Sequence, residues 1–205
     1  MPDIGLFLIA SALLTLAPGP DIVYVLTRGI AQGRRAGFAA ALGFATGVVF
    51  HTALAVLGVA ALIRSSEFAF TLVRYAGAAY LIYLGVRTLM SRSAIRLGQD
   101  GADIALWTVY KQSVIGNVLN PKVTLFFLSF LPQFINMKAG HLELQMVLLG
   151  VLFMLQTIVI FGAIAFFSGT IGDRLRTKPA IADRLNIFAG VIFIVLGIRV
   201  AWPTS

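Results

Sequence analysis

The sequence contains no cysteine, and only 12% of its 205 residues are charged. The missing cysteine excludes disulfide bonds, thiol redox chemistry and cysteine-ligated metals. It therefore also excludes the membrane proteins whose function is a thiol relay. The scarcity of charge excludes a water-soluble globule, because such proteins are typically about a quarter charged and about half apolar. Here 59% of the residues are hydrophobic and the mean hydropathy is +0.94, so too little polar surface is present to cover a soluble domain.

Acidic residues are also scarce: eight stand against sixteen lysines and arginines, which leaves a net charge of +8. In a soluble protein such an excess would suggest a nucleic-acid partner. In a membrane protein Lys and Arg collect on the cytoplasmic side, and this explanation fits the hydropathy. We therefore expect the partner to be the lipid bilayer and not nucleic acid.

Six apolar segments follow one another along the chain. Each is long enough for a membrane-spanning helix, which takes about 20 residues to cross about 30 Å of hydrocarbon. Together they predict an all-α polytopic membrane protein, folded as a single transmembrane domain over residues 1–205. The segments cover residues 4–27, 36–63, 68–90, 113–135, 144–167 and 185–202.

The distribution of basic residues predicts how these six segments are oriented. Eleven of the sixteen lie in the loops after the first, third and fifth segments, and three lie on the opposite side: Arg64, Lys138 and Arg199. Lys and Arg are enriched in cytoplasmic loops. The three basic loops are therefore expected in the cytoplasm, and both termini outside.

The two halves of the chain share a design. Segments one and four each have an apolar half, a proline break beside a charge, and a second apolar half; the sequence Leu84 to Arg87 also resembles Leu196 to Arg199. Three spans per half give the halves opposite orientations, and we expect a 3+3 inverted repeat, typical of secondary transporters whose substrate sites lie at broken helices. The predicted halves are residues 1–90 and 113–205, joined by a cytoplasmic loop at 91–112.

The first break lies at Pro18, Gly19 and Pro20. Its two prolines remove two backbone donors within three residues, so carbonyl groups around Leu14 lose their helical partners. At membrane depth such groups are tolerated only where protein or a wet cavity satisfies them. Asp21 follows in the first turn of a new half-helix, where the helix dipole stabilises a carboxylate.

The second break repeats these parts with a charge of opposite sign. Asn120 is a candidate helix cap, Pro121 and Lys122 follow it, and Asn117 lies one turn earlier. An isolated charge inside the bilayer is costly, so we expect Asp21 and Lys122 to pair. An amino acid carries both charges: its carboxylate suits Lys122, and its ammonium suits Asp21 and the unpaired carbonyls. The alternative is a permanent ion pair that only holds the bundle together.

Three further polar side chains inside the spans, His51, Tyr80 and Gln156, are candidates for a proton path. Imidazole titrates near neutral pH, so His51 could relay protons. A buried histidine that bonds a neighbouring helix is an equally supported interpretation. For Tyr80 the alternative is packing, and for Gln156 it is a hydrogen bond between helices. The sequence shows no group of metal ligands, so we expect no metal site.

Six motifs resemble those of the lysine-exporter (LysE) superfamily, and the resemblance covers nearly the whole chain. The homoserine/threonine (RhtB-type) exporters are the branch that the sequence resembles most. The resemblance implies a six-span amino-acid exporter of the bacterial inner membrane, with efflux coupled to proton entry. The motifs are Leu16–Asp21 and Asn117–Lys122, which are the more specific, together with Gly33–Gly37, Gly43–Gly47, Gly77–Gly85 and Phe130–Phe134.

The leading hypothesis is therefore a secondary transporter, not an enzyme, that exports amino acids or close derivatives by proton antiport. Its substrate would bind at the Pro18–Asp21 and Asn120–Lys122 breaks, and it would need no cofactor besides the proton gradient. An intramembrane enzyme with Asp21 and His51 as acid and base is one alternative, but the sequence shows no activated nucleophile. A non-transporting scaffold would leave the paired breaks unexplained. The identity of the amino acid stays open, and so does assembly into a homo-oligomer.

Overall fold

A computed structural model describes residues 4–59, 61, 66–90, 103–136, 139–177 and 179–202 of the chain. The described part is mostly helical, with short π-helical turns at η1 (Ala55–Val59) and η2 (Phe126–Phe130) and a 3₁₀ turn at η3 (Leu131–Phe134). The α-helices are α1 (Ile4–Leu16), α2 (Pro20–Ala31), α3 (Arg34–Leu54), α5 (Glu67–Met90), α6 (Leu106–Val118), α7 (Pro121–Leu125), α8 (Leu142–Phe166), α9 (Ser168–Thr177) and α10 (Pro179–Ala201).

The helices have the length and composition of a multi-pass membrane protein. Within the described residues, four helices are long and apolar enough to span a membrane, and six spans result if each of two bent pairs counts as one. The chain bends by 60° between α1 and α2, and by 46° between α6 and the stretch Pro121–Phe134. Both bends lie at the predicted proline breaks, so the expected broken helices are present.

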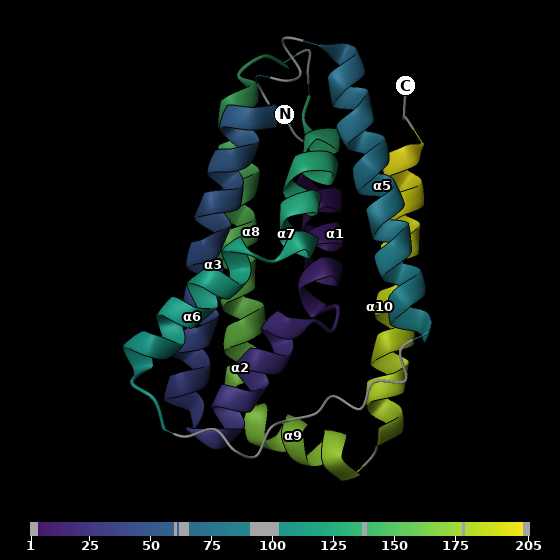
Figure 1. Cartoon of the computed structure of the whole chain (residues 1–205). Coiled ribbons are helices and arrows are strands. Elements are labelled where there is room, and N and C mark those ends of the chain that lie inside the picture. The colour runs from purple at the N-terminus through teal and green to yellow at the C-terminus, as the bar shows by residue number, and fades with distance from the viewer. Residues whose placement is uncertain are drawn as a thin grey trace.

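The broken helices meet near the middle of the bundle. In Figure 1, α3 and α8 lie on one side and α5 and α10 on the other. Helices α1 and α7 lie between these pairs, whereas α6 packs on α3 at the edge of the bundle. The first broken segment runs down the view and the second runs up it. The turn between α2 and α3 lies at the same end as α9, while α1 begins and α10 ends at the opposite end (Figure 1). This alternation agrees with the order of spans expected from the sequence.

The sequence placed some boundaries wrongly. The fourth segment begins at Leu106 and not near residue 113, because α6 includes the polar turn around Lys111 and Gln112. The stretch after the fifth segment, predicted as a loop, contains the amphipathic helix α9, which packs against α2. The end of the second segment and residues 91–102 of the predicted cytoplasmic loop fall outside the described residues.

Glycines allow the closest helix contacts. An ideal Cβ on Gly85 of α5 would lie 2.7 Å from the Gly190 carbonyl oxygen of α10, and one on Gly197 would lie 2.8 Å from the Ala78 oxygen. On the other side of the bundle, Gly43 and Gly47 of α3 form a face of small residues that packs against α6. Small residues are what allow membrane helices to approach this closely.

Two apolar cores flank the helix breaks. The larger is built from α1, η2, η3, α8 and α10 and includes a set of buried aromatic rings: Phe7, Phe126, Phe130, Phe134 and Phe153. The smaller joins α2, α3 and the second half of α8 around Val25, Phe44 and Phe161. Ala17 belongs to the first core and Ile22 to the second, so the first helix break lies at their boundary.

Candidate functional site at the two helix breaks

The first break leaves backbone groups that the helix itself cannot satisfy. Pro18 has no N–H to give to the carbonyl of Leu14, which lies four residues earlier. Gly19 joins the two half-helices in an extended conformation, with φ −160° and ψ 177°. An ideal Cβ on Gly19 would lie 2.7 Å from Asp21 Oδ1 and 3.2 Å from Lys122 Nζ. A larger residue would therefore displace the Asp21 carboxylate and crowd the Lys122 ammonium.

The second break is capped as the sequence predicted. The Asn120 side chain accepts a hydrogen bond of 3.0 Å from the backbone N–H of Lys122, and Pro121 occupies the start of α7. Both features are typical of a helix N-terminus. The cap fixes the backbone of Lys122, so that its side chain starts from a defined point on α7.

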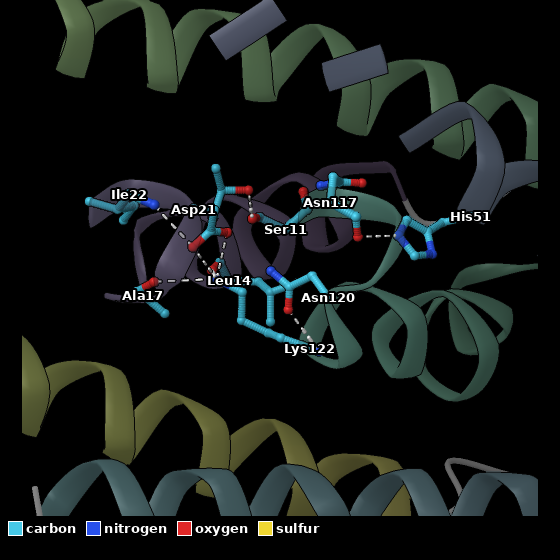
Figure 2. Close-up of polar contacts among 10 residues, drawn as sticks. Ser11, Leu14, Ala17, Asp21, Ile22, His51, Asn117, Asn120 and Lys122 are labelled. Atoms are coloured by element: carbon cyan, nitrogen blue, oxygen red, sulfur yellow. Dashed lines mark hydrogen bonds and ion pairs between the residues drawn. The ribbon is translucent and has the colours of Figure 1, made fainter. Parts of the chain in front are cut away.

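The two breaks meet in a buried ion pair. Lys122 Nζ lies 3.0 Å from Asp21 Oδ2 and 3.4 Å from Oδ1, and the two residues are 6% and 3% exposed. The same ammonium donates to the carbonyl oxygens of Leu14 at 3.3 Å and Ala17 at 3.4 Å (Figure 2). The expected Asp21–Lys122 pair is therefore present, and Lys122 itself satisfies the carbonyl that Pro18 leaves without a donor.

A small cavity adjoins this pair. Its volume of about 10 Å³ is room for about one water molecule, so an amino acid can enter only if the surrounding helices move apart. Besides Asp21 and Lys122, its polar lining comes from Asn117, Thr15 and Thr157, whereas the rest of the wall is apolar. The apolar lining residues are Leu14, Val123, Phe153 and Phe161.

Asn117 and His51 form the end of the polar cluster that lies beyond Lys122. His51 is fully buried, and its Nε2 donates a hydrogen bond of 2.9 Å to the carbonyl oxygen of Asn117. The sequence left two interpretations of His51 open, and this contact is the predicted bond to a neighbouring helix. Its function as a proton relay stays a prediction.

Two other candidates for the path lie away from the cavity. The Gln156 amide packs against α1, where its carboxamide faces the Leu8 oxygen, the Ser11 hydroxyl and the Ala12 N–H. The Tyr80 ring contacts Tyr83, with centroids 6.0 Å apart, on the same helix. Neither Gln156 nor Tyr80 is among the residues that line the cavity.

A family model agrees with this architecture over most of the chain. The model of the LysE type translocator matches residues 12–203, a range that contains both breaks and both charges. The chain belongs to the LysE type translocator family. Its six-segment plan and broken helices are thus those of a transport protein, and the family predicted from the sequence motifs is confirmed. The homoserine/threonine branch stays a prediction.

Relatives of this LysE-type translocator align over almost its full length. A leucine efflux protein of Enterobacter sp. (strain 638) is 32% identical over 199 residues, which cover 95% of this chain and 93% of the relative. An uncharacterized membrane protein of Vibrio cholerae is 30% identical over 196 residues, covering 95% and 94% of the two chains. The leucine efflux protein of Salmonella typhimurium is 28% identical over 197 residues, covering 95% and 92%. No solved structure matches the chain significantly.

The translocator's cavity wall was the part of the site that the sequence did not predict. Leu14, Phe153 and Phe161 are apolar residues within apolar helices. Only the packing of α1 against α8 shows that these residues, and not their apolar neighbours in the sequence, line the cavity. Thr157 carried a weak signal, as one of the few polar residues of the fifth segment. The sequence predicts a path role for its neighbour Gln156, which faces α1. Within the described residues, no three His, Cys, Asp or Glu side chains gather as metal ligands.

Proposed function

We propose that this translocator exports amino acids across the bacterial inner membrane in exchange for protons. The observation that carries the proposal is the position of the Lys122 ammonium, which bonds the Asp21 carboxylate and the Leu14 and Ala17 carbonyls. These acceptors suit any primary ammonium group, including the α-ammonium of an amino acid. Lys122 thus holds the place that a substrate ammonium would take.

Binding would proceed as an exchange of partners. The substrate inserts between the two charges, its ammonium group replaces Lys122 on Asp21 and the carbonyls, and its carboxylate binds the released Lys122. The N-terminus of α7 adds its partial positive charge beside that carboxylate. While Asp21 is ionised, every buried charge keeps a partner both with and without bound substrate, which avoids the penalty of an unpaired charge within the membrane.

Coupling to protons would act through Asp21. A proton on Asp21 removes the negative charge, so Asp21 holds neither Lys122 nor the substrate ammonium electrostatically. A ligand drives a conformational change only by binding the two conformations differently, and protonation supplies such a difference here. Protons entering from outside would release the exported amino acid there. The basic loops would face the cytoplasm, in the orientation that the lysine and arginine count predicts.

The cavity wall favours an amino acid with an apolar side chain. No charged residue except Asp21 and Lys122 lines the cavity, and both are used by the substrate's backbone groups. The hydroxyl groups of Thr15 and Thr157 donate to backbone oxygens of their own helices, at 2.8 and 2.9 Å. A charged substrate side chain would find no partner, and burial of an unpaired charge is strongly unfavourable. The names of the leucine efflux relatives support the same class of substrate.

A counterflow assay with purified protein in liposomes tests this function. Labelled leucine, methionine, threonine, lysine and glutamate are offered to vesicles loaded with the same unlabelled amino acid. We expect leucine and methionine to exchange fastest, lysine and glutamate slowest, and Lys122→Gln to abolish exchange. Lys111→Gln, which removes an exposed lysine of α6, is the matched control and should exchange like the wild type. No exchange of any amino acid by the wild type would contradict the proposal.

A further inference from the structure

Two residues of α3 hold Asn117 of α6 in place. Gly47 and His51 are four residues apart, so they lie one turn apart on the same helix face. His51 Nε2 donates to the Asn117 carbonyl oxygen at 2.9 Å. At Gly47, an ideal Cβ would lie only 2.6 Å from Asn117 Cβ and 2.7 Å from its Oδ1. The Asn117 side chain therefore occupies the space that the missing Gly47 side chain leaves.

The His51 bond replaces a donor that the second break removes. In an uninterrupted helix the N–H of residue 121 would donate to the carbonyl of residue 117, but Pro121 has no N–H. The Asn120 N–H supplies one bond to that oxygen, at 2.9 Å, and His51 supplies a second. Lys122 serves the Leu14 carbonyl beside Pro18 in the same way. At each break, a side chain from the other half of the chain thus bonds the carbonyl four residues before a proline.

The held residue lines the site and has an unused acceptor, which packs against Gly47 of α3 in this conformation. Asn117 is 3% exposed and lines the cavity beside Asp21 and Lys122. Its Oδ1 is one of the few buried side-chain atoms without a hydrogen-bond partner among the described residues. A buried acceptor without a hydrogen bond is unfavourable, which favours a bond from any ligand that can donate to it. The substrate ammonium is such a donor.

We propose that His51 and Gly47 are positioning residues that hold the Asn117 carboxamide at the cavity wall, where a rotation of that amide brings its oxygen to the substrate ammonium group. The proposal rests on the proposed function, and it assigns His51 a role as hydrogen-bond donor in place of proton relay. His51 Nδ1 has no partner within the described part of the chain, where no hydrogen bond links the His51 ring to Asp21. In Figure 2, Asn117 lies between Asp21 and His51.

Three substitutions of His51 separate the two roles. Glutamine can place an amide nitrogen near the position of Nε2 but cannot relay protons. Asparagine is equally polar but shorter, so its amide cannot reach that position, and leucine has no donor at all. The ring contacts of His51 with Phe50 and Phe127 are lost in all three variants, which makes them matched controls for one another. Each is assayed for the KM of leucine efflux and for acceleration of efflux by an imposed pH gradient.

We expect His51→Gln to retain the wild-type KM and the full response to the gradient. His51→Asn and His51→Leu should raise KM by about 2- to 10-fold, the loss of one hydrogen bond, and still respond to the gradient. Gly47→Ala should also raise KM, because its methyl group displaces Asn117.

His51→Gln that transports without responding to the gradient, or His51→Leu with an unchanged KM, would overturn the proposal. If His51→Leu does not fold, the result for His51→Gln decides alone. A wild type that carries no amino acid contradicts the proposed function instead.

Discussion

At the scale of single residues, the main feature of the site is that two opposite charges are buried together. Asp21 and Lys122 are both almost fully buried, and each is the other's counter-charge. Removing one partner of a buried pair leaves the other charge unpaired, which is more damaging than removing both. The pair therefore stays together unless a ligand supplies an ammonium group for Asp21 and a carboxylate for Lys122. An amino acid supplies both.

The stability of variants should show this interdependence. Asp21→Asn or Lys122→Gln alone should lower the free energy of unfolding by about 3–5 kcal/mol, because a buried charge loses its partner. The double variant should be more stable than the sum of the two losses predicts. Thermal unfolding in detergent measures all three, with Asp103→Asn, an exposed carboxylate, as the control. Fully additive losses would show that the two charges do not interact.

The residues that sequence reasoning identified are those whose chemistry is locally out of place. A proline, an aspartate or a lysine inside an apolar segment is visible without any knowledge of packing, and Pro18, Asp21, Asn120 and Lys122 are all at the site. Phe153 and Phe161 look like any other lipid-compatible residue. Their place at the cavity depends on the rotation of α8 about its axis, which an evenly apolar helix does not encode.

At the scale of elements, the two breaks bring backbone groups and charges to the same place. Each break ends one half-helix and starts another. Backbone carbonyls and N–H groups of both broken segments that lack a helical partner therefore face the site. The span boundaries were predicted well where polar residues flank an apolar run, as for α5 and α8. The predicted start of the fourth span was wrong, because α6 begins before the polar residues Lys111 and Gln112 and continues through them into the apolar segment.

Restoring a donor at the second break tests its function. Pro121→Ala provides an N–H for the Asn117 carbonyl, so α6 and α7 should become straighter. We expect the free energy of unfolding to change by less than about 1 kcal/mol, the net value of one hydrogen bond. Exchange of leucine should fall roughly tenfold or more, because the site loses its geometry. Unchanged exchange would show that the break is not needed for transport.

The α5–α10 contact offers a test of packing that does not involve the site. A methyl group at Gly85 would lie 2.6 Å from Ile194 Cγ1 and 2.7 Å from the Gly190 oxygen. Gly85→Ala should therefore lower the free energy of unfolding by about 1–3 kcal/mol. At Gly116 the nearest atom would be 3.6 Å away, so Gly116→Ala should be neutral or stabilising by up to about 1 kcal/mol. Equal thermal shifts for the two variants would contradict the close approach.

At the scale of the whole molecule, corresponding helices of the two predicted halves lie against one another. The pairs are α3 with α8 and α5 with α10, and the broken segments meet through Asp21 and Lys122. The sequence predicted the paired breaks from a proline beside a charge within each of two apolar segments. It could not predict α9, because a short amphipathic helix and a polar loop have similar composition.

The absence of cysteine makes the orientation directly measurable. Asp103→Cys and Ala139→Cys each introduce one exposed thiol into a chain that otherwise has none. We expect a membrane-impermeant maleimide to label Cys at 139 in intact cells, and Cys at 103 only after the cells are opened. The opposite labelling pattern would reverse the predicted orientation and place the basic loops outside.

The central claim is that Asp21 couples proton entry to amino-acid export, and efflux from liposomes tests it most directly. Vesicles are loaded with the labelled amino acid that the wild type carries best, and the outside is acidified. We expect acidification to accelerate efflux through the wild type and through Asp103→Asn, and to leave efflux through Asp21→Asn unchanged. If acidification accelerates efflux through Asp21→Asn as much as through the wild type, Asp21 does not couple transport to protons.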